Sequence, residues 1–171
     1  VSLHATDVCA SHTNIEMTME HILTEYPNTL YTTIGGDHSI TAPLVRAISQ
    51  KHPGQKIGII QFDTHLDMRD FTNGRTNGTP IRQLVEEGFV DGQNIFNIGL
   101  HGFYNAPSLL EVANKYQINM ITLKQLRTIG INETISRVFE HLSNVDIIYV
   151  TVDIDVLDIA FAPGVPSATP G

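Results

Sequence analysis

Three short blocks of the sequence contain carboxylate and imidazole side chains of the kind that bind divalent metal ions. They read Gly-Gly-Asp-His, Asp-Thr-His-Leu-Asp and Asp-Ile-Asp, and the last two each follow a run of apolar residues. Oxygen and nitrogen donors without a thiolate suit a borderline ion such as Mn²⁺, whereas carboxylates alone favour Mg²⁺ or Ca²⁺. Gathered at one point, so many carboxylates would repel one another unless cations lay between them. The blocks therefore predict a site for two metal ions, with the candidate ligands His38, Asp63, His65, Asp67, Asp153 and Asp155.

The spacing within two of the blocks indicates how the ligands are presented. Alternate side chains of an extended strand point the same way. If the chain stays extended after each apolar run, Asp63, His65 and Asp67 share one direction, and Asp153 and Asp155 share another.

Each block has a simpler interpretation when it is considered alone. The two glycines could form an ordinary strand-to-helix turn with Asp37 or Ser39 as the helix N-cap, and His38 could be a histidine satisfied by its surroundings. The motif Asp-x-Asp occurs in many loops. All three blocks, however, fall at the carboxyl ends of predicted strands, where open α/β sheets form their ligand sites. This equivalent placement favours the metal site.

The elements that would position these blocks alternate between strand-like apolar runs and segments of helical period. This alternation predicts βαβ units, an α/β fold and a mainly parallel sheet. The expected strands span 29–34, 56–62, 94–100, 119–122 and 146–152, the last being apolar enough for a fully buried parallel strand. After an irregular start and with a loop at 69–79, the expected helices span 15–26, 39–51 and 80–87, a segment from Pro107, a turn at 124–127, and 132–142.

Composition limits the class of protein. A chain of 171 residues with 42% hydrophobic and 16% charged residues is long enough for one packed domain, which we expect to span 1–171. A formal net charge of −8 without a basic stripe argues against nucleic acid as a partner. The single cysteine, Cys9, excludes an internal disulfide, fits a reducing compartment and is expected to be buried. No apolar stretch reaches the length of a membrane span and no signal segment opens the chain, so the cytoplasm is the expected location.

The motifs resemble those of the ureohydrolase family, which holds arginase, agmatinase and formiminoglutamase. The resemblance covers nearly the whole chain, and its three signatures are Gly-Gly-Asp-His-Ser at 35–39, Phe-Asp-Thr-His-Leu-Asp at 62–67 and Val-Asp-Ile-Asp-Val-Leu-Asp at 152–158. The later Ala162-Pro163-Gly164, with Pro166, extends the third signature. The resemblance implies an arginase-like three-layer α/β/α fold, two Mn²⁺ ions per subunit bridged by hydroxide, and a homo-oligomer.

By motif position, the resemblance assigns the six candidate ligands to the metal pair and implies that Asp63 and Asp153 bridge the two ions. The reaction needs the two ions because an amidine-like carbon is a poor electrophile and neutral water is a poor nucleophile. Two ions lower the pKa of a bridging water and so supply hydroxide. Asp63 thereby takes part in catalysis, and Asp158 resembles the family carboxylate that steadies the hydroxide and passes its proton to the departing nitrogen. The alternative for Asp158 is a loop cap just past a strand.

Two residues resemble those of formiminoglutamase in particular. Asn77 stands where arginases and many agmatinases have the His of a His-Gly segment, and Arg69 completes the formiminoglutamase form of the second block. A fixed guanidinium at position 69 could grip a substrate carboxylate in a bidentate pair. The alternative is a surface arginine paired with Asp70. Arg82 could play the same part but is expected on a solvated helix face, and His101 stands where relatives often have Arg.

The function implied by the resemblance is hydrolysis of N-formimino-L-glutamate to L-glutamate and formamide, in histidine degradation. The substrate is a small-molecule amidine, and the alternative is an agmatinase or another guanidino-compound ureohydrolase that releases urea. A noncatalytic metal-binding subunit is a second class of function, but an intact ligand set argues against it. The chain begins without Met and stops at Gly171, so we expect a central fragment that exposes apolar faces and is weak or inactive alone.

Overall fold

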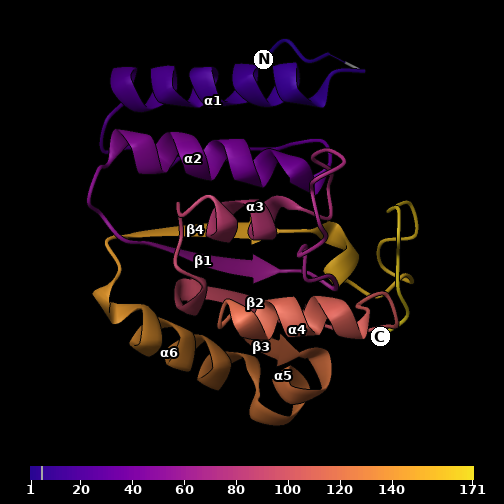
Figure 1. Cartoon of the computed structure of the whole chain (residues 1–171). Helices are drawn as coiled ribbons and strands as arrows, with labels where there is room; N and C mark the ends of the chain where they lie inside the picture. The colour runs from indigo at the N-terminus through magenta and orange to yellow at the C-terminus, as the bar shows by residue number, and fades with distance from the viewer. Residues whose placement is uncertain (5) are drawn as a thin grey trace. The chain divides into compact units, whose positions relative to one another are not determined.

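The computed structural model describes residues 1–4 and 6–171 and alternates helices with parallel strands (Figure 1). The chain divides into two compact units. Unit 1 comprises Val1–Gln55 and Asp67–Phe89, and unit 2 comprises Lys56–Leu66 and Val90–Gly171. A single domain spanning 1–171 stays a prediction.

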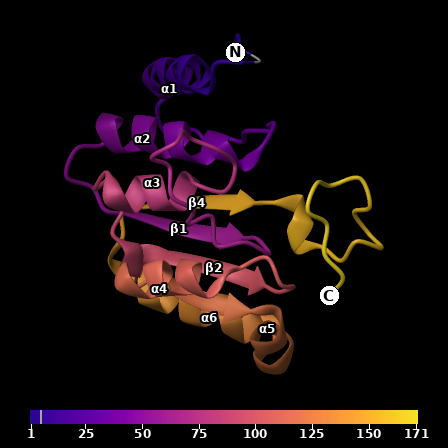
Figure 2. The ribbon, with the colours of Figure 1, turned by 45° about the vertical axis from the view of Figure 1, so that its right-hand side comes forward.

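Unit 1 is helical. Its elements are α1 (Val8–Glu25), the 3₁₀ turn η1 (His38–Ile40), α2 (Thr41–Lys51) and α3 (Pro80–Glu86). Helices α1 and α2 lie side by side in both views, and α3 packs on α2 (Figures 1 and 2). The side chain of Asp7 caps α1 by accepting the N–H of Ala10, so the helix starts well before the segment expected from its apolar spacing. The buried residues of α1 form one stripe at helical spacing, namely His12, Ile15, Met19 and Leu23.

The strand expected at 29–34 is absent from the structure. Residues 29–34 have no regular secondary structure, and Leu30 and Ile34 are 92% and 95% exposed. A strand needs a hydrogen-bonded neighbour for its backbone groups, and every ladder among the described residues joins strands of unit 2. The prediction was wrong because β-branched composition alone does not supply a partner.

Unit 2 contains the sheet. Its strands are β1 (Ile57–Phe62), β2 (Ile95–Leu100), β3 (Asn119–Thr122) and β4 (Ile147–Val152), all parallel and in the order β3-β2-β1-β4. Its helices are α4 (Pro107–Lys115), α5 (Leu123–Ile129) and α6 (Ile131–His141), with the 3₁₀ turns η2 (Gly92–Asn94), η3 (Leu142–Asn144) and η4 (Ile154–Val156). Because the strands are parallel, their carboxyl ends share one edge. The predicted strands and helices of this unit are confirmed.

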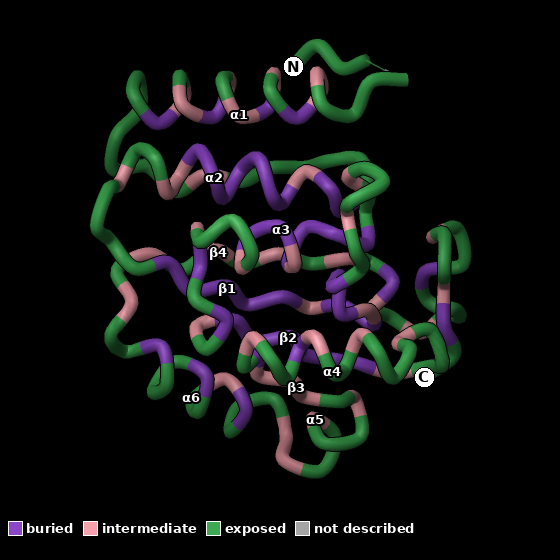
Figure 3. The backbone as a smooth tube through the Cα atoms, viewed as in Figure 1, coloured by how far each residue is buried: buried purple, intermediate pink, exposed green. Residues whose placement is uncertain are grey.

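One face of this sheet packs on α5 and α6. Ile60, Phe96 and Ile98 form a buried cluster with Val138 and Leu142, and β1 and β2 are buried almost throughout (Figure 3). Full burial of one such aliphatic side chain stabilises a fold by about 1.5–3 kcal/mol.

Strand β4 departs from the expected full burial. Its residues alternate between partly buried and exposed, and Val150 and Val152 are 55% and 56% exposed. The register pairs these two valines with Ile60 and Phe62, so they belong to the face that α5 and α6 cover elsewhere. The helices α5 and α6 do not extend over this edge strand, which leaves an apolar strip exposed.

Two surface properties of the chain bear on the expectations from composition. Cys9 is exposed in the first turn of α1, so the expectation of a buried cysteine was wrong. None of the helices among the described residues is long and apolar enough to cross a membrane.

Candidate metal centre

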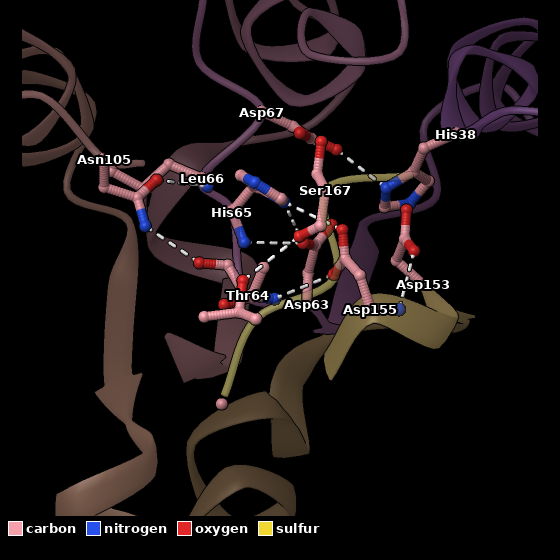
Figure 4. A network of polar contacts seen from close by, with 12 residues as sticks. His38, Asp63, Thr64, His65, Leu66, Asp67, Asn105, Asp153, Asp155 and Ser167 are labelled. Atoms are coloured by element: carbon pink, nitrogen blue, oxygen red, sulfur yellow. Dashed lines mark hydrogen bonds and ion pairs between the residues drawn. The ribbon is translucent and has the colours of Figure 1, made fainter. Parts of the chain in front are cut away.

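In unit 2, two carboxylates converge on the imidazole of His65 at the carboxyl edge of the sheet (Figure 4). Nδ1 of His65 lies 2.9 Å from an oxygen of Asp155 and 3.4 Å from an oxygen of Asp63. One donor atom from each residue lies within 4.8 Å of the others, and both carboxylates are buried. Hydrogen bonds to Asp155 and Asp63 raise the pKa of His65 to about 10. The two carboxylates therefore favour a positive charge between them.

In unit 1, Nδ1 of His38 lies 2.7 Å from Oδ2 of Asp67, and both side chains are nearly buried (Figure 4). His38 begins the turn η1, whose N-cap is Asp37, as one of the simpler interpretations of that block proposed. The carbonyl of Asp67 accepts the N–H of Arg82 in α3. Asp67 has φ +54°, a left-handed conformation that aspartate tolerates better than most residues. The turn η1 therefore positions His38, and a left-handed backbone conformation positions Asp67 against it.

The ligand blocks are tight turns, not continuations of strands. Asp63 accepts the N–H of His65 at 2.6 Å, and Asp153 accepts the N–H of Asp155 at 3.0 Å. An aspartate side chain bonded to the N–H two residues on closes an Asx turn, which replaces the extended conformation. The expectation of shared directions along an extended chain was wrong for this reason. The ligands converge because the turns fold them together.

The donor set fits a divalent metal ion. It consists of carboxylates and imidazoles without a thiolate, which suits Mn²⁺. In unit 2 the acidic groups Asp63 and Asp155 are 0% and 4% exposed, and buried charges of like sign are costly unless a cation compensates them. Asp153 lies at the start of the same turn as Asp155. The structure thus groups Asp63, His65 and Asp155 in unit 2, with Asp153 beside them, and His38 with Asp67 in unit 1.

The candidate substrate residues Arg69 and Asn77 are both exposed in the 69–79 loop of unit 1. The Arg69 N–H donates to the carbonyl of Gly78, and the Arg69 stem lies so close over Gly78 that its Cδ would be 2.8 Å from a Cβ there. Among the described residues Arg69 forms no ion pair, and Asp70 pairs instead with Arg82. The alternative pairing of Arg69 with Asp70 is therefore wrong.

Arg82 lies on α3 and is already engaged. Its guanidinium contacts Glu86 at 2.8 Å and Asp70 at 3.3 Å. These contacts agree with the expectation that it belongs to a helix face. Of the two candidate arginines, only Arg69 is without an ion pair among the described residues.

Asp158 has the contacts of a loop cap. Its carboxylate accepts the N–H of Ala160 at 2.7 Å and that of Gly171 at 2.8 Å. The bonds from Gly171 and Ala160 lower its pKa. A catalytic role for Asp158 stays a prediction.

Sequence reasoning missed three amide side chains next to the unit 2 ligands. Gln61 and Asn97 face each other on β1 and β2 and are 0% and 1% exposed, and Asn105 lies on the loop after β2. A signal was present for the first two, because each is a polar residue inside an otherwise apolar strand. Asn105 gave no such signal, because it lies in a loop, where a polar residue is ordinary.

The chain belongs to the arginase family, whose family model matches residues 1–171. It is 38% identical over its whole length to a formimidoylglutamase of Halalkalibacterium halodurans and 35% identical to that of Bacillus subtilis. It spans 54% of the length of each, so it corresponds to about half of these curated relatives.

Solved structures show the same fold. The crystal structure of the Bacillus subtilis formimidoylglutamase matches 99% of this chain with a TM-score of 0.94, and the chain covers 53% of it. A Trypanosoma cruzi formiminoglutamase solved with Mn²⁺ matches 99% of the chain at 26% identity with a TM-score of 0.84, and the chain covers 55% of it. These likenesses confirm the predicted arginase-like α/β fold.

Proposed function

We propose that the full-length protein is a binuclear manganese hydrolase that converts N-formimino-L-glutamate and water to L-glutamate and formamide. The observation that supports this substrate best is the exposed Arg69 guanidinium, which has no ion-pair partner among the described residues and lies two residues after the ligand Asp67. The likeness to formimidoylglutamases supports the same choice. The carboxylate and imidazole donors of the candidate ligands support Mn²⁺ as the metal.

Six residues would hold the metal pair, namely His38, Asp63, His65, Asp67, Asp153 and Asp155. Bound there, the ions would supply a nucleophilic hydroxide at neutral pH and polarise the substrate carbon. The chain itself contributes the orientation of the ligands. Asp63 and Asp153 are locked by Asx turns, and Asp67 is fixed by a left-handed backbone and the bond from Arg82. Preorganised charge of this kind needs no rearrangement when the substrate arrives.

Arg69 would bind a substrate carboxylate. A guanidinium presents two parallel N–H donors that match a carboxylate, and it repels a cationic substrate such as agmatine. Packing of the Arg69 stem on Gly78 restricts the side chain before binding. Asn77, the residue before Gly78, offers a neutral amide where a histidine would add a titratable group. This pair therefore favours an anionic glutamate derivative.

Two further parts of the proposal depend on family resemblance alone. The protein would act in the cytoplasm, in histidine degradation, and it would be a homo-oligomer. Analytical ultracentrifugation of the full-length protein tests the second part, and a monomer at micromolar concentration would contradict it.

The proposal is tested by assaying the full-length protein with Mn²⁺ against formiminoglutamate, agmatine, arginine and guanidinobutyrate. Formamide and urea are followed separately. We expect formamide from formiminoglutamate and little urea from any guanidino compound. Urea as the main product would instead establish a guanidino-compound ureohydrolase with the same metal site.

Removal of the Arg69 side chain tests the substrate contact. A charge-assisted bidentate contact contributes about 1.5–3 kcal/mol, so Arg69→Ala should raise KM for formiminoglutamate by about 10- to 100-fold. Arg82→Ala is the matched control, because this guanidinium is engaged by Glu86 and Asp70 and should leave KM nearly unchanged. An unchanged KM in Arg69→Ala would show that the Arg69 side chain does not bind the substrate.

A further inference from the structure

We propose that Asn105 is a positioning residue for the metal-binding turn Thr64–Leu66, and that the buried amides of Gln61 and Asn97 complete its support. This inference depends on the proposed metal site. It concerns a residue that contacts no reacting atom and acts through the peptide groups around His65.

The side chain of Asn105 forms hydrogen bonds with the backbone on both sides of His65 (Figure 4). Its amide oxygen accepts the N–H of Leu66 at 3.0 Å, and its NH₂ group donates to the carbonyl of Thr64 at 2.8 Å. Two bonds of opposite polarity from one planar group fix both the position and the tilt of the turn. The direction of the His65 imidazole follows from that tilt.

Two buried amides hold the carbonyl between these bonds. Asn97 donates to the carbonyl of His65 at 2.5 Å, and Gln61 approaches the same oxygen at 3.4 Å. Gln61 also donates to Oδ2 of Asp63 at 2.9 Å. Side chains thus satisfy backbone groups of a turn that no strand pairs, which buried peptide groups require.

The loop that contains Asn105 meets the turn at two further points. The hydroxyl of Thr64 donates to the carbonyl of His101 at 3.0 Å. The ring of Tyr104 lies against the imidazole of His65, with the ring centroids 5.5 Å apart. The loop after β2 therefore acts as a brace for the ligand turn, with Asn105 as its central contact.

A brace of this kind tunes metal affinity. Groups that orient metal ligands without touching the metal typically change affinity by about 10- to 100-fold when they are removed. Asn105→Ala in the full-length protein should therefore weaken Mn²⁺ binding, measured by calorimetric titration, by about 10- to 100-fold. The Mn²⁺ electron paramagnetic resonance spectrum should broaden, because the ligand turn is no longer held in one arrangement.

Asn119→Ala is the matched control. Asn119 also donates its amide to two backbone carbonyls, those of Gln93 at 2.8 Å and Ile95 at 3.1 Å, but these lie at the amino end of β2. We expect Asn119→Ala to lower the unfolding midpoint about as much as Asn105→Ala and to leave Mn²⁺ affinity unchanged. If Asn105→Ala does not fold, Asn105→Asp serves instead. It keeps the acceptor for Leu66, loses the donor to Thr64 and should also bind Mn²⁺ more weakly.

The outcomes separate this inference from the proposed function. Mn²⁺ affinity in Asn105→Ala equal to that of the unaltered protein, or an equal loss in Asn119→Ala, would overturn the positioning role. Failure of the unaltered protein to bind Mn²⁺ would overturn the proposed function first. Because no substrate is present in the titration, a wrong substrate assignment leaves the result intact.

Discussion

At the scale of single residues, the first aspartate of each acidic block has a structural task besides its charge. Asp37, Asp63 and Asp153 each accept the N–H of the residue two positions on. The bond closes the turn. Charge and geometry can therefore be separated by experiment, because asparagine closes the same turn without a charge.

Asp153→Asn makes that separation. The amide oxygen can still accept the N–H of Asp155, so the unfolding midpoint should hardly change. The lost charge should weaken Mn²⁺ binding by more than about 100-fold and abolish turnover with it. Titration with Mn²⁺ and circular dichroism measure the two effects. Activity retained in Asp153→Asn would overturn the two-metal interpretation, and Asp153→Ala shows the added effect of losing the turn.

At the scale of elements, the sequence predicts strands that are apolar on both faces and misjudges those that depend on neighbours. The predicted strands that correspond to β1 and β2 begin one residue before the observed strands, and the predicted bounds of β3 agree with the observed ones. Polar residues bound the apolar runs of β1 and β2 on both sides. Residues 29–34 have the composition of a strand without a partner, and β4 has the composition of a buried strand at an exposed edge. Whether a strand pairs with a neighbour, and whether a helix covers it, depends on residues far away in the chain, so the composition of the strand does not predict either.

The candidate site was predictable in its residue types and not in its geometry. Ligand identity follows from donor chemistry, so both groups of ligands contain only predicted residues. The turns were missed because an Asx bond competes with extended backbone at the same spacing. Asn105 was missed because its partners are peptide groups about forty residues away in the chain.

The close approach of β2 to η4 gives a test at this scale. Gly99 has φ +105°, and a Cβ there would lie 2.5 Å from Cγ2 of Val156, the residue after the ligand Asp155. Gly99→Ala should cost about 1–3 kcal/mol more than the matched change Gly130→Ala, whose Cβ at φ +88° would meet nothing within 4 Å. Mn²⁺ affinity should fall only in Gly99→Ala, since only this change displaces η4. Chemical denaturation measures the stability and titration measures the Mn²⁺ affinity. Equal stability losses in the two variants would show that Val156 moves aside at no cost.

At the scale of the whole molecule, the acidic chain contains one histidine whose burial makes stability depend on pH. His12 is 2% exposed in unit 1, and neither ring nitrogen has a hydrogen-bond partner among the described residues. Burial, then Arg46 and Arg75, lower its pKa below the ordinary 6.5, against the weaker pull of Asp37 and Glu16. Arg46 is itself held by Glu16 and Glu87 at 3.1 Å. The folded protein therefore keeps His12 neutral where the unfolded chain protonates it.

The stabilising effect of a neutral His12 is complete above pH 6.5 and is lost as the pH falls towards the lowered pKa. In that window the unfolded chain binds more protons, so the free energy of unfolding should rise with pH. His12→Leu should flatten this rise, whereas His21→Leu, at an exposed position of the same helix, should leave it unchanged. Urea denaturation at several pH values gives the slopes. An unaltered slope in His12→Leu would assign the acid sensitivity to other groups.

The interleaving of the two units has a consequence for synthesis on the ribosome. The central strand β1 belongs to unit 2, but the chain returns to unit 1 at Asp67 and leaves it again after Phe89. Neighbours β2 and β4 are made later, and β4 ends only at Val152. At elongation rates of about 5–20 residues per second, β1 waits on the order of ten seconds for β4. Both edges of this isoleucine-rich strand are open until β2 is made, and one edge stays open until β4 is made. Newly made chains should therefore depend on chaperones more than the finished protein does.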